Sequence, residues 1–85
     1  MQLSKEGQAL AELVGVVVGA VVDFPERVHT VVVESGTTVV IELTVTKEDI
    51  GKVIGRQGAM AQSIRTILSN AGTKLHRRTV LQIIE

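Results

Sequence analysis

The pattern of hydrophobic and polar positions divides the 85-residue chain into six segments of helical or extended character. Residues 3–22 show no strand-like alternation and end against Asp23-Phe24-Pro25, where proline stops a helix, so a helix is predicted there. Its many valines and two glycines give it a weak intrinsic propensity, so packing must stabilise it. Ala11, Gly15 and Gly19 recur every fourth position and predict a smooth stripe that lies close to a sheet, although a close helix crossing between subunits explains the same spacing.

Two β-prone stretches follow, at residues 28–34 and 37–46. Ser35-Gly36 between them fits a two-residue turn, so the pair is predicted to form a β-hairpin. In the second stretch apolar side chains share one face and polar side chains share the other, with Val40 as the exception. One face of this hairpin is therefore expected to be buried and the other mostly exposed to solvent.

The second half of the chain predicts two helices and a final strand. Thr46 followed by Asp49 has the form of a helix N-cap with an acidic residue in the first turn, and Gly55 ends this short helix because glycine adopts positive φ freely. A longer helix follows a four-residue turn, Gly72 is placed to cap it, and residues 80–84 form the last strand. The inward face of the longer helix is expected to consist of Met60, Ile64, Ile67, Leu68 and Ala71.

The order α-β-β-α-α-β indicates a single α+β domain over residues 1–85, because a chain this short cannot build two cores. The hydrophobic residues, 45% of the chain, are almost all aliphatic, and Phe24 is the only aromatic residue. The absence of cysteine excludes disulfides and thiolate sites and suits a reducing compartment. The longest apolar run is too short to span a membrane and makes a poor secretory signal, because Glu6 and Glu12 lie where basic residues are typical, so a cytoplasmic protein is expected.

The formal net charge is zero, but the charges are distributed unevenly. Residues 1–46 carry two cationic and six acidic residues, a net charge of −4, and residues 47–85 carry seven cationic and three acidic residues, a net charge of +4. Such an asymmetry can steer a polyanion to one face of a neutral protein, although a merely solvated surface has the same composition.

The candidate chemistry lies in the turn between the two central helices. Gly55 and Gly58 lack a Cβ, so a nucleic-acid backbone can come close to the peptide, and the following helix offers free amides and its positive dipole end to a phosphate. Cationic side chains beside the turn can hold phosphates, and apolar side chains can form the floor of a groove for bases. The cations are Lys52, Arg56 and Arg65, and the apolar residues are Ile50, Val53 and Ile54.

The segment Val53-Ile54-Gly55-Arg56-Gln57-Gly58 and the amphipathic helix after it resemble the signature of the KH domain family. A bare Gly-x-x-Gly is common, but its position between two helices, after a hairpin and before a last strand, makes this match specific. The order of elements is similar to the type II KH topology, which implies a three-stranded sheet with helices packed on one face. As a lone domain with this motif, the chain resembles the KhpA family of small bacterial RNA-binding proteins.

The resemblance also implies a function. Members of that family bind RNA, are proposed to act as RNA chaperones, and form homodimers or pair with a larger Jag-type KH protein. Single-stranded RNA is the expected ligand, and the expected RNA-binding residues are Lys52, Val53, Ile54, Gly55, Arg56, Gln57, Gly58 and Arg65. One departure from the KH pattern is Ala61, where many members carry a larger aliphatic residue in the groove.

Other functional classes have little support in the sequence. The glycine patterns of a P-loop and of a dinucleotide-binding fold do not occur around this turn. The chain shows no paired carboxylates, metal-binding cluster or Ser/His/Asp set, so a non-enzymatic protein without cofactor or metal is expected. Glu48-Asp49 is interpreted as helix-start charge, and His29 and His76 as surface or strand residues.

Two alternatives stay open at this point. The run Lys74–Arg78 either extends the basic surface toward RNA or is simply solvated. The KH fold could also serve as a protein-interaction module that dimerises or docks on a ribosome-associated partner.

Overall fold

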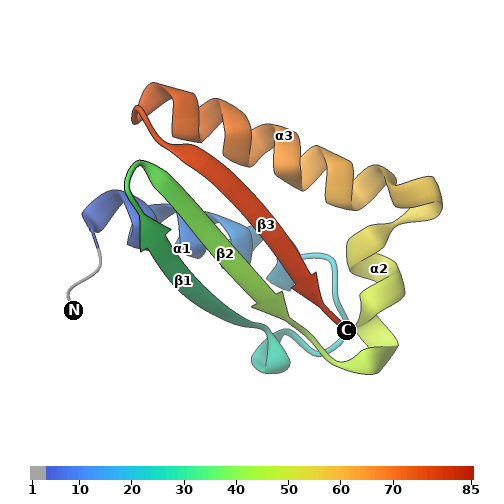
Figure 1. Ribbon diagram of the computed structural model, residues 1–85. Helices are drawn as coiled ribbons and strands as arrows, with labels where there is room; N and C mark the ends of the chain where they lie inside the picture. The colour runs from blue at the N-terminus through green and yellow to red at the C-terminus, as the bar shows by residue number, and fades with distance from the viewer. Residues whose placement is uncertain (1–3) are drawn as a thin grey trace.

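The computed structural model describes residues 4–85 and confirms the predicted order of elements (Figure 1). Leu3, which belongs to the helix expected at residues 3–22, lies outside the described residues. The chain forms helix α1 (Lys5–Gly19), strands β1 (His29–Ser35) and β2 (Thr38–Thr44), helices α2 (Ile50–Ile54) and α3 (Ala59–Lys74), and strand β3 (Arg78–Ile84). Short 3-10 turns lie between them at Pro25–Arg27, Lys47–Asp49 and Arg56–Gly58.

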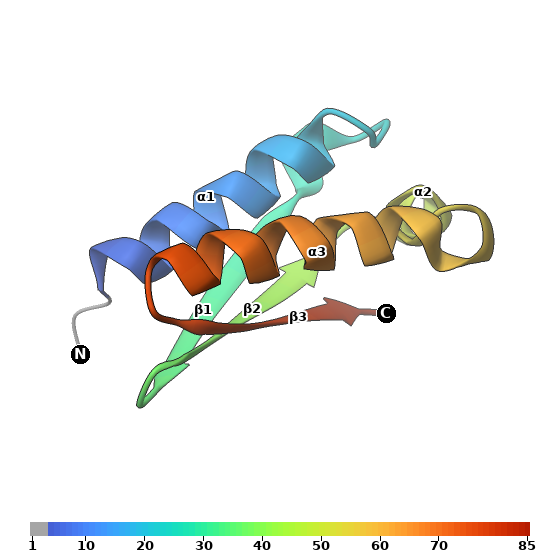
Figure 2. The ribbon, with the colours of Figure 1, turned by 90° about the horizontal axis from the view of Figure 1, so that it is seen from above.

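The strands form one sheet in the order β1-β2-β3. β1 and β2 are an antiparallel hairpin with Val33 opposite Val40, and β3 lies parallel to β2 with Leu81 opposite Ile41. A parallel neighbour requires a crossover connection, which α2 and α3 supply. The long helices α1 and α3 lie side by side on one face of the sheet (Figures 1 and 2), which confirms the α+β arrangement with helices on one face.

The core lies between the sheet and the two long helices. β2 is the central strand, and its inward side chains Val39, Ile41 and Leu43 are all 0% exposed. Ile67, expected to face inward from α3, is 45% exposed, so that prediction is wrong. Helices of weak propensity gain their stability by packing an apolar stripe against such a sheet. The stripe of α1 consists of Leu10, Val14 and Val18, and that of α3 consists of Ala61, Ile64 and Leu68.

The small-residue stripe of α1 does not have the predicted role. A Cβ placed on Gly15 would meet no atom within 4 Å, and one placed on Gly19 would come no closer than 3.9 Å to Cβ of Pro25. The prediction that these two glycines let the helix approach the sheet is therefore wrong. Val14 and Val18 are buried against the core instead.

The end of α3 also differs from the prediction. Gly72 does not cap the helix but is buried inside it, where a Cβ would lie 2.7 Å from both the carbonyl oxygen of Arg77 and Cγ2 of Thr79. The left-handed residue after the helix is His76, with φ 58°. The amides of His76 and Arg77 donate to the carbonyls of Thr73 and Gly72, at 3.1 and 2.7 Å, which closes the helix.

The end of α1 and the start of β3 differ from the predicted boundaries because of contacts with residues distant in the sequence. α1 ends at Gly19 rather than at residue 22, because the chain after it turns toward the buried carboxylate of Asp49. β3 begins at Arg78 rather than at residue 80, because the amide of Arg78 already donates to the carbonyl of Thr37 at 3.0 Å.

An ionic cluster fastens the start of α1 to the sheet. Glu34 accepts hydrogen bonds from the amide and the hydroxyl of Ser4, at 2.8 and 2.7 Å, and lies 3.2 Å from the Arg77 guanidinium. The Ser4 hydroxyl in turn accepts from the amide of Gly7 at 2.9 Å and so caps α1, while Arg77 also pairs with Glu6 at 3.6 Å. The two Ser4 hydrogen bonds, together with Arg77, hold the pKa of Glu34 below its ordinary value of 4.5.

Candidate nucleic-acid interface

The turn between α2 and α3 is Gly55-Arg56-Gln57-Gly58, and three of its four residues have a positive φ. Gly55 has φ 78° and ψ 175°, Gln57 has φ 56° and ψ 29°, and Gly58 has φ 77° and ψ 10°. Residues with a Cβ rarely adopt such angles, so the two glycines are required by the shape of the turn. Arg56 and Gln57 are exposed at its tip.

The two glycines face different surroundings. A Cβ on Gly55 would lie 2.6 Å from Cβ and 2.7 Å from the backbone nitrogen of Met60, so Gly55 lets the turn fold against the start of α3. A Cβ on Gly58 would meet no atom within 4 Å. The expectation that a bare backbone faces a ligand therefore fits Gly58, whereas Gly55 serves the fold of the turn.

Helix α3 begins at this open surface. Gly58 is its N-cap residue, and no side chain caps the helix. The first amides of a helix and its dipole attract anions. Arg56 is exposed beside them and takes part in none of the ion pairs found among residues 4–85. Backbone N–H groups and a guanidinium can hold a phosphate together here.

A groove of about 580 Å³ extends from the turn between α3 and the end of β3. Ile54, Ala61 and Ile83 supply apolar lining, and the polar and charged side chains in the lining are Gln57, Gln62, Arg65 and Glu85. Ala61 is only 3% exposed, so its side chain lies at the floor of the groove. A groove of mixed apolar and polar lining beside an anion site suits a base attached to a bound phosphate.

Two apolar residues that the sequence assigned to this groove lie elsewhere. Val53 is 0% exposed and belongs to the hydrophobic core, so its side chain is not available to RNA, contrary to the prediction. Ile50 lines a separate hollow with Val45 and Ile84. Ile83 lines the groove instead. No local pattern marks it, because only the parallel pairing of β3 with β2 brings it beside α2 and α3.

Asp49 joins the connection between α1 and β1 to the start of α2. It is 0% exposed, and its carboxylate oxygens accept hydrogen bonds from the amides of Asp23 and Phe24, each at 3.0 Å. Burial raises the pKa of this carboxyl, but the hydrogen bonds outweigh it and leave the pKa below its ordinary value of 3.8. Asp49 is an acidic residue at the helix start, as expected, but its carboxylate is buried and also binds the amides of Asp23 and Phe24, while the side chain of Thr46 does not cap the helix.

Lys52 is already paired within the protein. Its Nζ lies 3.0 Å from Oδ2 of Asp23, and this hydrogen-bonded carboxylate raises the pKa of Lys52 above its ordinary value of 10.5. Asp23 therefore competes with any phosphate for Lys52. The sequence offered no signal for this competition, because Asp23 lies far from the turn along the chain.

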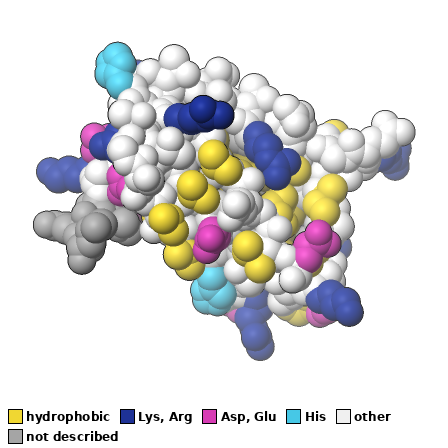
Figure 3. Space-filling view, in the orientation of Figure 1, with side chains coloured by type: hydrophobic (Ala, Val, Ile, Leu, Met, Phe, Trp, Pro, Cys, Tyr) yellow, Lys and Arg dark blue, Asp and Glu magenta, His cyan; other side chains and the backbone are white. Residues whose placement is uncertain are grey.

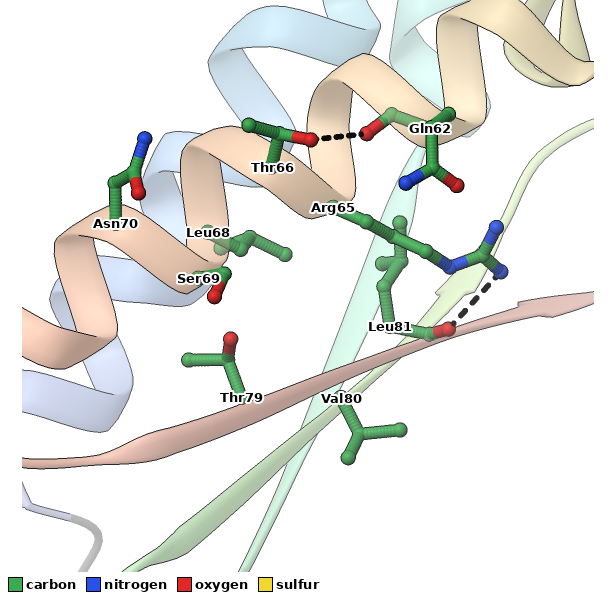
Figure 4. Close-up of a pocket in the computed structure, with 9 residues that line it drawn as sticks. All are labelled: Gln62, Arg65, Thr66, Leu68, Ser69, Asn70, Thr79, Val80 and Leu81. Atoms are coloured by element: carbon green, nitrogen blue, oxygen red, sulfur yellow. Dashed lines mark hydrogen bonds between the residues drawn. The ribbon is translucent and has the colours of Figure 1, made fainter.

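The remaining cations lie along α3. Arg65 extends toward β3, and its Nη2 donates to the carbonyl of Leu81 at 3.3 Å (Figure 4). The segment Lys74–Arg78 lies at the other end of α3 from the turn, about 24 Å away at the helical rise per residue (Figure 1). Within that segment Arg77 is held by the acidic residues of the cluster at the start of α1.

The part of the chain from residue 4 onward contains no group of three His, Cys, Asp or Glu side chains placed to hold a metal ion. No helix in this part is long and apolar enough to cross a membrane. His29 and His76 are exposed at the start of β1 and after α3, away from the turn.

Comparison with known proteins finds relatives over nearly the full length of the chain. The family model described as KhpA/KhpB, KH domain matches residues 11–83. The RNA-binding protein KhpA of Aquifex aeolicus is 43% identical over 77 residues, which cover 91% of this chain and 98% of the relative. The proteins of that name from Clostridium perfringens and Listeria monocytogenes are both 41% identical, over 88% and 89% of this chain and 100% of each relative.

Among solved structures, Era of Aquifex aeolicus is similar, with a TM-score of 0.65 and 19% sequence identity. The match covers 98% of this chain and 31% of the Era chain, so the present chain corresponds to about a third of that protein. At this level of identity the similarity is one of fold.

Proposed function

Because the chain belongs to the KhpA/KhpB KH-domain family, we propose that it binds single-stranded RNA at the turn Gly55–Gly58 and in the groove beside it. The observation that carries this proposal is the open backbone of Gly58 at the uncapped start of α3, next to the exposed Arg56. Relatives that align over their whole length carry the name RNA-binding protein, which supports RNA as the ligand of this chain.

In this proposal the turn holds the sugar-phosphate backbone and the groove takes the bases. The amides at the start of α3 and the Arg56 guanidinium bind phosphate, while Ile54, Ala61 and Ile83 contact the base faces. Arg65 adds charge at the rim of the groove, and Lys52 does so when it leaves Asp23. Because the groove contains no aromatic side chain to stack on, affinity for a strand of about four nucleotides is modest and tolerant of sequence.

Reversing the charge of the turn tests this assignment. We expect the double variant Arg56→Asp/Gln57→Asp to keep its circular dichroism spectrum and Tm, because both side chains are exposed, and to lose at least about tenfold in RNA affinity because carboxylates repel phosphate. Fluorescence anisotropy with labelled single-stranded RNA measures the effect. Wild-type binding should also weaken as salt is added.

Lys5→Asp is the control for this experiment. It reverses one cationic side chain, a net change of −2 against −3 in the double variant, at the start of α1, at the other end of the molecule from the turn (Figure 1). RNA binding should be nearly unchanged in this variant. If the double variant of the turn binds RNA as tightly as Lys5→Asp does, the turn is not the binding site.

RNA binding without catalysis fits a role as an RNA chaperone or post-transcriptional regulator. In this proposal the turn and the groove bind RNA through contacts only, and the proposal assigns no catalytic residues and no cofactor. Without cysteine the chain is suited to the reducing cytosol, which is the compartment we propose for it.

The face of the sheet opposite the long helices supports a second proposal, which is that two copies of the chain associate there. Hydrophobic side chains gather on this face (Figure 3), and Val31, Val33 and Ile84 are 54%, 48% and 43% exposed. Val33, Val40 and Val80 lie opposite one another across the three strands. Apolar patches of this kind are typical of interaction surfaces.

The charges on this face of one copy are complementary to those on the same face of a second copy. Glu42 on β2 and Arg78 on β3 lie on opposite sides of the row formed by Val33, Val40 and Val80. Two copies can stack face to face around a two-fold axis that runs along this row of valines, so that their strands run in opposite directions. Glu42 of each copy then lies beside Arg78 of the other.

Sedimentation equilibrium over a range of concentrations tests this association. The wild type should change from monomer to dimer as concentration rises, and Val33→Lys should remain monomeric with an unchanged fold. A wild type that is monomeric throughout, or that associates only with a larger Jag-type KH protein, would contradict the homodimer.

A further inference from the structure

Lys52 differs from the other cations of the proposed RNA site because a carboxylate of the protein already pairs with it. Its Nζ lies 3.0 Å from Oδ2 of Asp23. Arg56 and Arg65 take part in no ion pair among residues 4–85. The side chains of Lys52 and Asp23 are 46% and 66% exposed, so a phosphate in solution can reach this pair and exchange with the carboxylate.

The buried carboxylate of Asp49 fixes the backbone on both sides of this pair. Asp49 is the N-cap residue of α2, and Lys52 lies three residues later in the same helix. The oxygens of Asp49 accept hydrogen bonds from the amides of Asp23 and Phe24, each at 3.0 Å, and so hold the connection between α1 and β1 beside α2 (Figure 1). The fold itself therefore presents the Asp23 carboxylate to Lys52.

Two carboxylates act on the Lys52 ammonium group. Asp23 accepts a hydrogen bond from it and Asp49 acts on it through space, and both raise the pKa of Lys52 above its ordinary value of 10.5. The potential around Lys52 is therefore not that of an unpaired lysine. A phosphate meets an attractive cation here only after the Asp23 carboxylate has moved away.

Lys52 also lies close enough to the turn to contact RNA bound there. It precedes Gly55, the first residue of the turn, by three positions, and residues three apart lie on the same face of a helix. This separation is about 4.5 Å along the axis of α2 at the helical rise per residue. An extended lysine side chain covers such a distance, so Lys52, once free, can reach a phosphate next to the one held at the turn.

We propose that Asp23 is an internal competitor of RNA phosphate, which limits the affinity of the RNA site by holding Lys52 until a phosphate displaces the carboxylate. This inference rests on the proposed RNA binding. Asp23 determines affinity without touching RNA, because it acts through Lys52. The pair lies outside the groove, so Asp23 affects the hold on the sugar-phosphate backbone and not the contacts to bases.

Removing the charge of Asp23 tests this competition. Asp23→Asn keeps the backbone amide that donates to Asp49 but deprives Lys52 of its carboxylate. We expect RNA affinity to rise about two- to fivefold, because an exposed ion pair is weak. The slope of log affinity against log salt should become more negative by about 0.7, as expected for one added phosphate contact to a single strand. Fluorescence anisotropy with labelled single-stranded RNA at several salt concentrations measures both effects.

Glu26→Gln is the matched control. Glu26 is exposed in the same connection between α1 and β1, and it forms no ion pair in the part of the chain from residue 4 onward. Its replacement changes the net charge as Asp23→Asn does, and RNA affinity should stay close to that of the wild type. Equal gains in the two variants would overturn the proposal, since any lost negative charge would then raise the affinity.

A combined variant shows whether Asp23 acts through Lys52. Asp23→Asn/Lys52→Gln should bind RNA only as tightly as Lys52→Gln alone, because no ammonium group is left to release. A gain that persists without Lys52 would refute the competition. In the wild type, the carboxyl carbon resonance of Asp23 should shift when RNA is added, and this measurement does not depend on the folding of any variant. An unchanged resonance at saturating RNA would also refute the proposal.

The outcomes separate this inference from the proposed function. If Arg56→Asp/Gln57→Asp loses RNA binding while Asp23→Asn binds RNA no more tightly than the wild type, the turn is the RNA site and the pair of Asp23 with Lys52 serves only the fold. If Arg56→Asp/Gln57→Asp binds RNA as the wild type does, the proposed function fails and this inference fails with it.

Discussion

At the scale of single residues, positive φ angles arise at this turn and at the end of α3 for different reasons. Gly55 and Gly58 have nearly the same φ, but only Gly55 is pressed against Met60, and only Gly58 faces open space. The sequence predicts a turn at both glycines because two glycines between helices are a local signal. His76 also has a positive φ, and it was not predicted because glycine is the commoner residue at that position and Gly72 lies close by in the sequence.

Replacing each glycine of the turn with alanine separates stability from binding. Gly55→Ala should lower the free energy of unfolding by about 2 to 4 kcal/mol, since it combines backbone strain with a clash against Met60. Gly58→Ala should lower it by only about 1 to 2 kcal/mol, because strain acts alone. Urea denaturation gives both values.

RNA affinity should fall in Gly58→Ala, although this variant is the more stable of the two. The methyl group of Gly58→Ala projects into the space proposed for phosphate, so affinity should fall although the protein is folded. Equal losses of stability in the two variants would contradict the different surroundings of the two glycines.

At the scale of elements, local pattern predicted which segments are helices and strands, and tertiary contacts changed their details. The periodicity of α3 predicted Ile64 and Leu68 in the core but also Ile67, which is exposed, because periodicity does not determine how far a sheet extends around a helix. Val53 was assigned to the groove because its spacing fits a face of α2. The structure shows that this face is the one that packs on the core.

The Asp49 carboxylate at the start of α2 holds the segment that follows α1, and this contact can be tested by substitution. Asp49→Asn should lower Tm and speed hydrogen exchange at the amides of Asp23 and Phe24, because an amide group replaces one of the two acceptor oxygens. Glu48→Gln, an exposed neighbour, makes the same chemical change and should have several times less effect on Tm. Unchanged exchange at both amides in Asp49→Asn would exclude this role for the carboxylate.

At the scale of the whole molecule, the charge asymmetry of the chain serves the fold as well as the proposed ligand. Lys52 and Arg77 from the basic half pair with Asp23, Glu6 and Glu34 from the acidic half. These contacts join segments distant in the sequence and neutralise part of the basic half. Among the cations assigned to RNA binding, Arg56 and Arg65 are without an ion pair in residues 4–85.

The dependence of stability on pH follows from these groups. The pKa values of Glu34 and Asp49 are lowered in the folded protein, so the stability they contribute is present above their ordinary values of 4.5 and 3.8 and is lost as pH falls through the lower folded values. The pKa of Lys52 is raised, so its contribution is present below 10.5 and is lost as pH rises through the higher folded value.

Thermal unfolding should therefore show a plateau of Tm from about pH 5 to about pH 10 and a decline on both sides. Glu34→Gln should make the decline at acid pH shallower, and Asp23→Asn should do so at alkaline pH, because each removes one of the groups responsible. An acid limb that is the same in Glu34→Gln and the wild type would exclude Glu34 as a contributor.

The sequence by itself determined the order of helices and strands, the glycine turn and its cationic neighbours, because each depends on residues close together along the chain. Only the tertiary structure decided that Ile83 lines the groove, that Val53 does not, that Asp49 is buried, and that Lys52 is paired. Each of these depends on the parallel pairing of β3 with β2 or on the path of the chain between α1 and β1. Such contacts join residues far apart in the chain, and hydrophobic periodicity carries no information about them.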